Sequence, residues 1–433
     1  MKFKKLTILL YTTSVMFFVG CGEDYKWDTD NVSSLEGKYK TRDKSLDLNA
    51  SQQQRTIQNE AQNTFYSNKS AIGLIVNILY KDDTSKTYAY GCAKLKSEVQ
   101  STGLLNYATG NQENCEEPLL PTHRMKLGSL TKITVARTVL DIDDDIQYDF
   151  DIDDAITKHL PENITSLANL SNITVRDLLF HTSGLNEIDF KSGTVEEVLK
   201  IALSKTKLAD PGQYYKYNNT GYVLLGEIIK HVTQDEYWET QVMKRLDSAL
   251  KTHDFIFPER ENANWLKTND TPWMIGKSNT LLEGNSSLAL SYLHSSGKFV
   301  DVTSSDSPNF SHSAGSMIGT VPDVSRWMKE LVTNRSQLLS KAYFEKQVIN
   351  THFGDDYISH LTWNMGPGLG FEQTQNAYFH LGAISGFSCM SIYSKNEDVV
   401  ISACVNGAAL LSEFPFEILA EMYPYREAYI THD

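Results

Sequence analysis

Apolar positions gather into strand-like runs near the two ends of the chain and into helix-like runs between them. Short segments that are dense in β-branched and apolar residues predict buried strands, and the polar turns beside them predict where the chain reverses. The segments with this pattern are 71–80, 87–92, 386–393 and 399–406. Because they lie at opposite ends of the sequence, we expect one antiparallel sheet built from both termini.

Helical spacing of apolar residues predicts the elements between and beside these strands. Thr174 followed by Asp177 is a variant of the capping box and predicts a short helix through Phe180. Asn219 or Thr220 is expected to cap a longer helix. The other expected helices are 47–69, a buried helix that follows Ser129, 321–333 and about 411–422.

The order of these elements predicts an α/β (α+β) fold with two lobes. Helices flank the sheet, and a helical subdomain over about 140–330 is inserted between the strands of the two ends. Residues 95–121 are polar and irregular and indicate an insertion, and 260–312 indicate long loops over the cleft between the lobes. A domain of this length is long for one core, which fits two lobes.

Three short strings carry the candidate chemistry. In chain order they are Ser129-Leu130-Thr131-Lys132, Tyr217-Asn218-Asn219 and His380-Leu381-Gly382. Together they supply a hydroxyl nucleophile, an amine base, a phenol, an amide and an imidazole. Side chains of these types are the ones that make and break a covalent acyl-enzyme.

Ser-x-x-Lys alone is a weak signal, because it occurs at Ser129, Ser204, Ser248 and Ser295. Only the first follows a glycine and opens a buried helix, on which a spacing of three residues puts Ser129 and Lys132 side by side. A free lysine, with a pKa of ~10.4, is a poor base near neutral pH. Burial and a second cation lower such a pKa, so we expect a partly desolvated cleft.

Four collinear segments resemble the serine β-lactamase and penicillin-binding-protein superfamily. They are 125–132 (MKLGSLTK), 173–185 (ITVRDLLFHTSGL), 211–226 (PGQYYKYNNTGYVLLG) and 380–388 (HLGAISGFS). The resemblance spans about residues 60–425 and points to the branch of class C β-lactamases, D-alanyl-D-alanine carboxypeptidases and esterases. It implies that Ser129 is the nucleophile, Lys132 its base and Tyr217 the group that shuttles the proton to the leaving group.

The resemblance also implies the remaining parts of the site. The backbone N–H groups of Ser129 and Ala383 are expected to form the oxyanion hole. His181 and Ser183 are expected to form a structural turn that lines the cleft. From the residues themselves, Asn219 offers an amide to a substrate carbonyl or to Lys132, and its alternative is a pure N-cap.

His380 and Gly382 are predicted to bind substrate on a strand edge. Gly382 lets the substrate backbone approach the strand. His380 can donate a hydrogen bond to a substrate carboxylate and is partly charged near neutral pH, so we expect an anion site that titrates near ~6.5. Leu381 takes the place of the threonine that is usual in this motif, which weakens the expected recognition of a carboxylate.

These observations predict a serine hydrolase that acts through an acyl-enzyme and is carboxypeptidase-like or esterase-like. The alternatives are a class C-like β-lactamase and a non-catalytic sensor of peptidoglycan or β-lactams. The chain contains no G-x-S-x-G motif and no H-x-H or HExxH spacing, which disfavours an α/β-hydrolase and a metallohydrolase. We expect no cofactor and no metal, a small-molecule or peptidoglycan-derived peptide substrate, and a monomer.

The first residues indicate export. Lys2, Lys4 and Lys5 precede the apolar stretch 6–19, which is too short to span a membrane as a mature helix. Gly20-Cys21 resembles the cleavage site of bacterial lipoproteins, and the alternative is ordinary cleavage that leaves Cys21 as an orphan thiol. We expect a signal peptide at 1–20, a polar tether at 21–46 and the hydrolase domain at 47–433. The resemblance implies a lipid on Cys21 and a place in the cell envelope, at the outer membrane, periplasmic or surface-facing.

The charge of the chain excludes one class of partner. Cleavage before Cys21 removes three lysines and no acid, so the net charge changes from −14 to −17, which is unfavourable for nucleic-acid binding. Residues 141–154 hold eight acids, but they lack a glycine-containing ligand loop of the EF-hand type, so we expect a solvated loop rather than a calcium site.

Four cysteines of the domain are disulfide candidates. Cys389 and Cys404 lie symmetrically about the turn 395–398, which places them opposite each other across the expected hairpin. An exported chain permits such a bond. Cys92 and Cys115 are a looser pair, and buried free thiols are the alternative for both.

Overall fold

A computed structural model describes most of the domain. It covers residues 72–96, 115–188, 194–213, 215–257, 288–289, 292–295, 298–301, 311–349, 372–373, 377–384 and 386–407, together with the single positions 52, 55 and 59. The expected signal peptide, tether, most of the helix 47–69 and the helix 411–422 lie outside the described residues. Their boundaries stay predictions.

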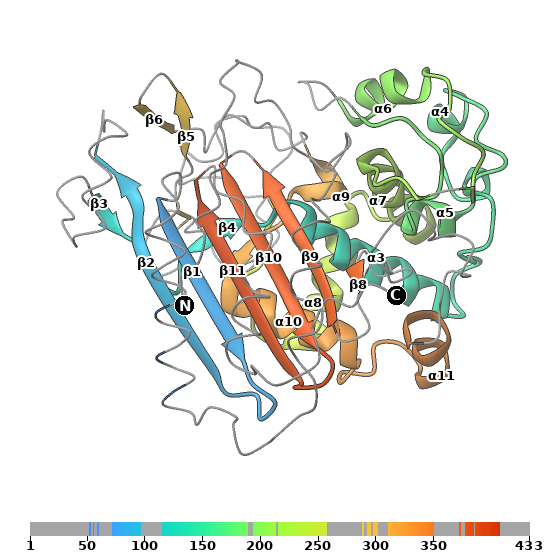
Figure 1. The fold of residues 1–433 in the computed structure, drawn as a ribbon. Helices are drawn as coiled ribbons and strands as arrows, with labels where there is room; N and C mark the ends of the chain where they lie inside the picture. Colours follow the sequence, from blue (N-terminus) through green and yellow to red (C-terminus); the bar gives the residue numbers. More distant parts are fainter. Residues whose placement is uncertain are drawn as a thin grey trace, which may run out of the picture.

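One antiparallel sheet of seven described strands forms the centre of the fold, with the order β3-β2-β1-β11-β10-β9-β8 (Figure 1). The strands are β1 Gly73–Leu79, β2 Ser85–Leu95, β3 Cys115–Pro118, β8 Glu372–Gln373, β9 Ala377–Ile384, β10 Phe387–Ser394 and β11 Val399–Asn406. β1 pairs directly with β11, Leu74 opposite Val405. The prediction of one sheet built from both ends of the chain is therefore confirmed.

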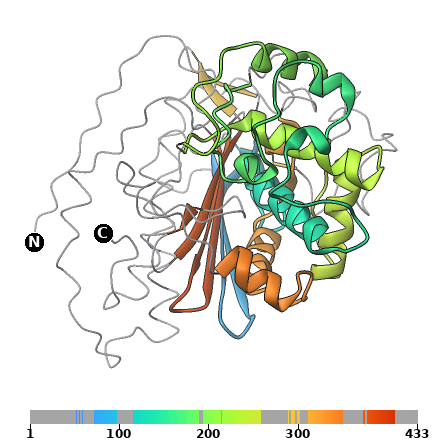
Figure 2. The same ribbon diagram turned by 90° about the vertical axis from the view of Figure 1, so that its right-hand side faces the viewer.

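Helices cover one face of this sheet, which Figure 2 shows edge-on. The helical elements are η3 Gly128–Leu130, α3 Thr131–Asp144, η4 Ile156–Lys158, α4 Glu162–Thr165, α5 Val175–Leu179, α6 Val195–Leu203, α7 Asn219–Thr233, α8 Trp238–Leu250, α9 His312–Gly315, α10 Val321–Thr333, α11 Lys341–Phe344 and η6 Glu345–Ile349. Two small sheets accompany them, β4 Arg124–Lys126 with β7 Ile318–Thr320, and β5 Tyr292–Ser295 with β6 Lys298–Asp301.

The main core lies between the helices and the sheet, and a second apolar cluster lies on the opposite face. Ile75 and Leu79 belong to the main core, whereas Leu74, Val76 and Ile78 belong to the second cluster. Successive side chains of a strand point to opposite faces. Because both faces of β1 are buried, the run that encodes it is apolar throughout rather than alternating.

Most of the predicted elements are confirmed at their expected positions. α10 begins after Thr320, whose side chain accepts a hydrogen bond from the N–H of Asp323. α5 begins with the predicted capping box of Thr174 and Asp177, in which each side chain binds the other residue's backbone. The hairpin of β10 and β11 also matches its prediction.

Three details differ from the sequence expectations. Asn218, and not Asn219 or Thr220, caps α7, because its side chain accepts the N–H of Gly221. The acidic segment is not entirely loop, since its first four residues complete the last turn of α3. The expected loop region 260–312 contains β5 and β6, which pair with each other.

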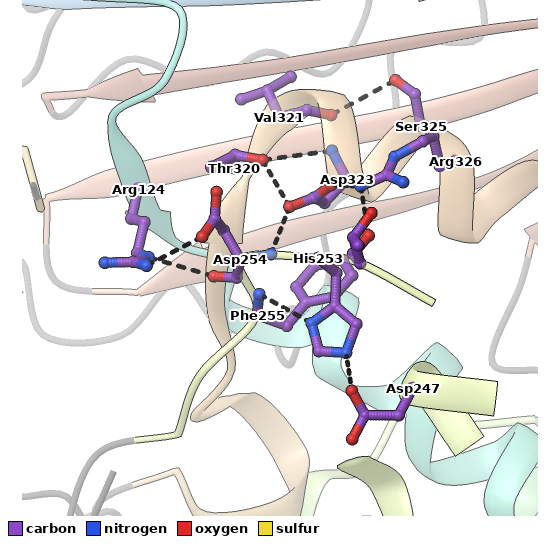
Figure 3. A network of polar contacts seen from close by, with 11 residues as sticks. Arg124, Asp247, His253, Asp254, Phe255, Thr320, Val321, Asp323, Ser325 and Arg326 are labelled. Carbon is purple, nitrogen blue, oxygen red and sulfur yellow. Dashed lines mark hydrogen bonds and ion pairs between the residues drawn. The ribbon is translucent and has the colours of Figure 1, made fainter. Parts of the chain in front are cut away.

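A polar network fixes β4, the strand that leads into the first candidate motif (Figure 3). The buried side chain of Arg124 donates to the backbone oxygen of Asp254 at 3.2 Å and to its carboxylate at 3.1 Å. The N–H of Asp254 in turn donates to the carboxylate of Asp323 at 2.7 Å, and Thr320 donates to the same oxygen. The network ties β4 and the start of α10 to the segment after α8.

In the part of the chain that the structure describes, no helix combines the length and apolar character needed to cross a bilayer.

Both candidate cysteine pairs are disulfides in the structure. Cys389 and Cys404 lie directly opposite each other on β10 and β11, and Cys92 is joined to Cys115 between β2 and β3. They close loops with sequence separations of 15 and 23 residues. Cross-links of this span stabilise a fold by about 3 kcal/mol each in the chain-entropy description.

Thiol titration of the denatured, unreduced protein tests this pairing. In a form that lacks Cys21, we expect no reactive thiol before reduction and four after it. Reduction should also lower the melting temperature, because the unfolded chain regains conformational freedom. Four reactive thiols before reduction would exclude both bridges.

Candidate active site

Ser129 lies on a tight turn pressed against the edge of β9. Gly128 has φ +54°, and a Cβ atom there would lie 2.8 Å from the backbone nitrogen and oxygen of Ala383. A Cβ on Gly382 would lie 2.0 Å from the backbone oxygen of Leu127. The turn and the strand therefore meet backbone to backbone, which only glycine permits at both positions. This contact brings Ser129 close to Ala383, the two residues whose backbone N–H groups were predicted to form the oxyanion hole.

Lys132 begins the next turn and points back to the serine. Its Nζ lies 2.9 Å from the Ser129 Oγ and 2.6 Å from the backbone oxygen of Ala314 in α9. The side chain is fully buried, whereas Ser129 is partly exposed. The structure thus holds the amine between the Ser129 hydroxyl and a fixed carbonyl, in a desolvated position of the kind that the sequence argument required.

Tyr217 lies beside this amine. The Lys132 Nζ is 4.9 Å from the centroid of the Tyr217 ring, and the His380 ring lies 6.4 Å from that ring. The three motifs that the sequence singled out therefore converge, although 251 residues separate Ser129 from His380.

His181 packs against the ring of Tyr217. The two rings are stacked with centroids 4.5 Å apart, and the His181 Nδ1 accepts the N–H of Asn218 at 3.0 Å. Burial, and then the charge of Lys132, lower the pKa of His181 well below its ordinary value. A neutral imidazole that accepts from the backbone fits the structural turn that was expected there, together with the buried Ser183.

Asn219 binds a carboxylate that the sequence analysis missed. Its Nδ2 donates to the Glu187 Oε1 at 2.6 Å, and its backbone N–H donates to Oε2 at 2.9 Å. Burial raises the pKa of Glu187, against the lowering effect of these hydrogen bonds and of Lys132. The available signal was an acid two residues after the turn 181–185, but nothing in the sequence showed that it faces Asn219.

His380 is not the charged group that its sequence suggested. It is buried on β9, and its Nδ1–H donates to the backbone oxygen of Leu381. Burial and the charge of Lys132 lower the pKa of His380 to about 3. The imidazole is therefore neutral near neutral pH, and its remaining nitrogen is an acceptor, so the expected titrating anion site is wrong in this respect.

Among the described residues, no group of three or more His, Cys, Asp or Glu side chains is placed to hold a metal ion. The predicted lipidation residue, Cys21, lies outside the described residues.

The antiparallel sheet, the helical layer and a Ser-Lys-Tyr group at their junction define a class of protein, the hydrolases of the β-lactamase and penicillin-binding-protein fold. The chain belongs to the Beta-lactamase family, whose model matches residues 76–420.

Individual relatives share low sequence identity with this chain, over only part of its length. Protein flp of Staphylococcus aureus (strain COL) is 26% identical over 141 residues, which cover 31% of this chain and 28% of that protein. A teichoic acid D-alanine hydrolase of S. aureus is 27% identical over 152 residues, 34% of this chain and 36% of the relative. The matched segments thus span about a third of these curated relatives.

A solved structure resembles the fold over most of its length. The D-amino acid amidase from Ochrobactrum anthropi SV3, complexed with D-phenylalanine, superposes with a TM-score of 0.62. The sequence identity is 19%, and the match covers 86% of this chain and 98% of the amidase. At this identity the likeness establishes the shared fold alone.

Labelling by a serine-directed fluorophosphonate tests the three central residues. We expect Ser129→Ala to abolish labelling, and Lys132→Ala and Tyr217→Phe each to slow it by about 10²–10⁴-fold, the usual contribution of a positioned proton-transfer group. The two slow variants should not be additive when combined, because the groups act as one unit.

Two control variants keep this test specific. Ser183→Ala and Ser204→Ala should label at the wild-type rate. Full activity of either Lys132→Ala or Tyr217→Phe would contradict the assignment, as would labelling of Ser129→Ala that Ser183→Ala or Ser204→Ala loses.

The charge state of His380 predicts a pH profile. Its pKa of about 3 means that the imidazole gains a proton only in strong acid, so His380 should contribute no step to kcat/KM between about pH 5 and 8. Profiles of the wild type and of His380→Asn should therefore run parallel over this range, after scaling. A step near pH 6.5 that is present in the wild type and lost in the variant would show that His380 is charged as the sequence suggested.

Proposed function

We propose that the protein is a serine hydrolase that forms an acyl-enzyme on Ser129 and acts on D-amino acyl esters or amides. The observation that carries the proposal is the 2.9 Å contact between the Lys132 Nζ and the Ser129 Oγ. It puts an amine in position to take the proton of the hydroxyl as that oxygen attacks a carbonyl carbon.

The first half-reaction follows from this contact. The Ser129 Oγ forms a bond to the carbonyl carbon while its proton passes to Lys132, which must be neutral at that moment. Removal of the amine from water favours the neutral form, because a buried ammonium loses its hydration. The N–H groups of Ser129 and Ala383 supply the donors for the oxyanion that develops on the carbonyl oxygen.

Collapse of the tetrahedral intermediate completes acylation. The bond to the leaving group breaks, and the phenol of Tyr217 gives its proton to the departing oxygen or nitrogen and regains one from Lys132, which lies beside it. Water then attacks the acyl-enzyme by the same steps in reverse, which releases the acid and restores the Ser129 hydroxyl. No step requires a cofactor.

The neighbourhood of His380 favours one class of substrate. A carboxypeptidase must hold the terminal carboxylate of its peptide, but His380 is neutral and the next side chain is Leu381. An ester or amide whose leaving group lacks a carboxylate does not need that contact. Two of the relatives above carry D-amino acyl substrates in their names, a teichoic acid D-alanine hydrolase and a D-amino acid amidase, which supports the same class.

The cellular setting is part of the proposal. The basic and apolar N-terminus and Cys21 favour an exported monomer held at the cell envelope by lipid on that cysteine. Envelope polymers and peptidoglycan fragments would then be within reach of the site.

A substrate panel on the signal-free protein tests the reaction. We expect turnover of nitrophenyl acetate and faster turnover of a D-alanyl ester than of its L-alanyl counterpart. A D-Ala-D-Ala peptide and a chromogenic cephalosporin should react slowly, because His380 is neutral and offers no charge to their carboxylates. Ser129→Ala is the control for spontaneous hydrolysis.

Other outcomes of the panel would point elsewhere. Efficient cephalosporin turnover that is insensitive to replacement of His380 would favour a class C-like β-lactamase. Efficient peptide cleavage would favour a carboxypeptidase. Stoichiometric acylation without turnover of any compound would indicate a sensor rather than an enzyme.

A further inference from the structure

A buried ion pair lies behind Lys132, between α7 and α9, and takes no part in the chemistry described above. The His312 Nε2 is 3.3 Å from the Glu227 Oε1. Their exposed fractions are 3% and 8%. A pair of ionisable groups at this depth is costly unless each charge is compensated, so its presence next to the site calls for a physical reason.

The hydrogen bonds place a proton on the His312 Nδ1. The Ser313 hydroxyl donates its single proton to the backbone oxygen of Tyr222 at 2.8 Å. The 2.6 Å contact between that hydroxyl and the His312 Nδ1 must therefore use the imidazole N–H as donor. The other ring nitrogen faces Glu227. An ionised carboxylate can only accept, so the contact with Glu227 favours a second proton on this nitrogen and hence an imidazolium.

The charge of Glu227 agrees with this assignment. Burial alone would raise the pKa of Glu227, but His312 and Lys230 together lower it to about 2. The Lys230 Nζ lies 2.9 Å from the second oxygen of the carboxylate. Glu227 is therefore ionised, and it joins α7 to α9 through a charge-assisted contact.

α9 connects this pair to the candidate base. It has only four residues, and its first residue, His312, has a φ of +40°, a conformation that a side chain normally avoids. So short and strained an element depends on its neighbours for its position. Two residues after His312, the backbone oxygen of Ala314 binds the Lys132 Nζ at 2.6 Å.

Gly226 shows how closely α9 must approach α7. A Cβ at this position would lie 2.2 Å from the Ser313 Oγ and 2.8 Å from the Cε1 of His312. The missing side chain of Gly226 thus leaves the space that His312 and Ser313 occupy. Two independent features therefore set the contact between α7 and α9: the attraction between Glu227 and His312, and the absence of a side chain at Gly226.

We propose that Glu227 and His312 are positioning residues, whose ion pair holds α9 so that the Ala314 carbonyl aims the Lys132 amine at Ser129. This inference rests on the proposed function, since it assumes that Lys132 takes the proton of Ser129. Neither residue touches the reacting atoms. Displacement of a catalytic group by about 1 Å can cost about 10²-fold in rate, so loss of the pair should slow acylation rather than weaken binding.

Glu227→Gln tests the pair, with a nitrophenyl ester as the probe. The burst amplitude counts correctly folded sites, and the burst rate constant reports acylation at each of them. We expect a burst rate constant about 10–100-fold lower at saturating ester, with an amplitude close to that of the wild type while acylation stays faster than deacylation. The dissociation constant of the ester, taken from the concentration dependence of the burst rate, should change by less than about twofold.

Glu330→Gln is the matched control for lost stability. Glu330 is a similarly buried carboxylate near the end of α10, where it accepts hydrogen bonds from the N–H of Ser336 at 3.1 and 3.2 Å. Replacement of either carboxylate should lower the melting temperature of the protein. Glu330→Gln should nevertheless leave the burst rate constant unchanged. A structural role alone would make the two variants behave alike.

Gly226→Ala provides a second test that alters no charge and stays informative if Glu227→Gln does not fold. The added methyl group should push α9 away from α7 and slow the burst by a similar factor. The inference is overturned if the folded variants of both positions acylate at the wild-type rate, or if Glu330→Gln slows the burst as much as they do. Failure of the wild type to acylate Ser129 at all would instead overturn the proposed function.

Discussion

The candidate site depends on one contact, the close approach of the turn at Gly128 to the backbone of Gly382 and Ala383 in β9. The glycines at positions 128 and 382 leave no side chain between the two segments, so the turn that bears Ser129 rests directly on the strand edge. Any larger residue would separate them by the width of a methyl group. The sheet that pairs the two ends of the chain holds β9 at this place. β9 pairs with β10, β10 pairs with β11, and β11 pairs with β1.

Burial of Lys132 sets the electrostatics around this contact. The amine is surrounded by the Ser129 hydroxyl, the Ala314 carbonyl and the rings of Tyr217 and Tyr222. Its charge lowers the pKa of both nearby histidines, His181 and His380, beyond the effect of their own burial. With neutral imidazoles on two sides, Lys132 is the one of these groups placed within hydrogen-bond distance of the Ser129 hydroxyl.

Carboxylates outside this inner group are engaged with backbone and side-chain donors. Glu187 binds the amide and the N–H of Asn219, and Glu227 binds His312 and Lys230. Each therefore stabilises the place where a helix or turn enters the site. A carboxylate that accepts from such donors orients its neighbours.

The sequence by itself determined the strands at both ends, the helix α10, the capping box of α5 and the three motifs of the site. These features are encoded by local periodicity, by short capping signals and by side-chain chemistry, all of which a sequence displays. Tertiary structure alone decided the role of Glu187, the choice of Asn218 over Asn219 as the cap of α7, and the neutral state of His380. Each of these depends on partners and burial supplied by segments distant in the chain: Asn218 caps α7 beside His181, and His380 lies in the field of Lys132. A sequence shows which groups can titrate or donate, but desolvation and the distance to the nearest charge exist only once the chain has folded.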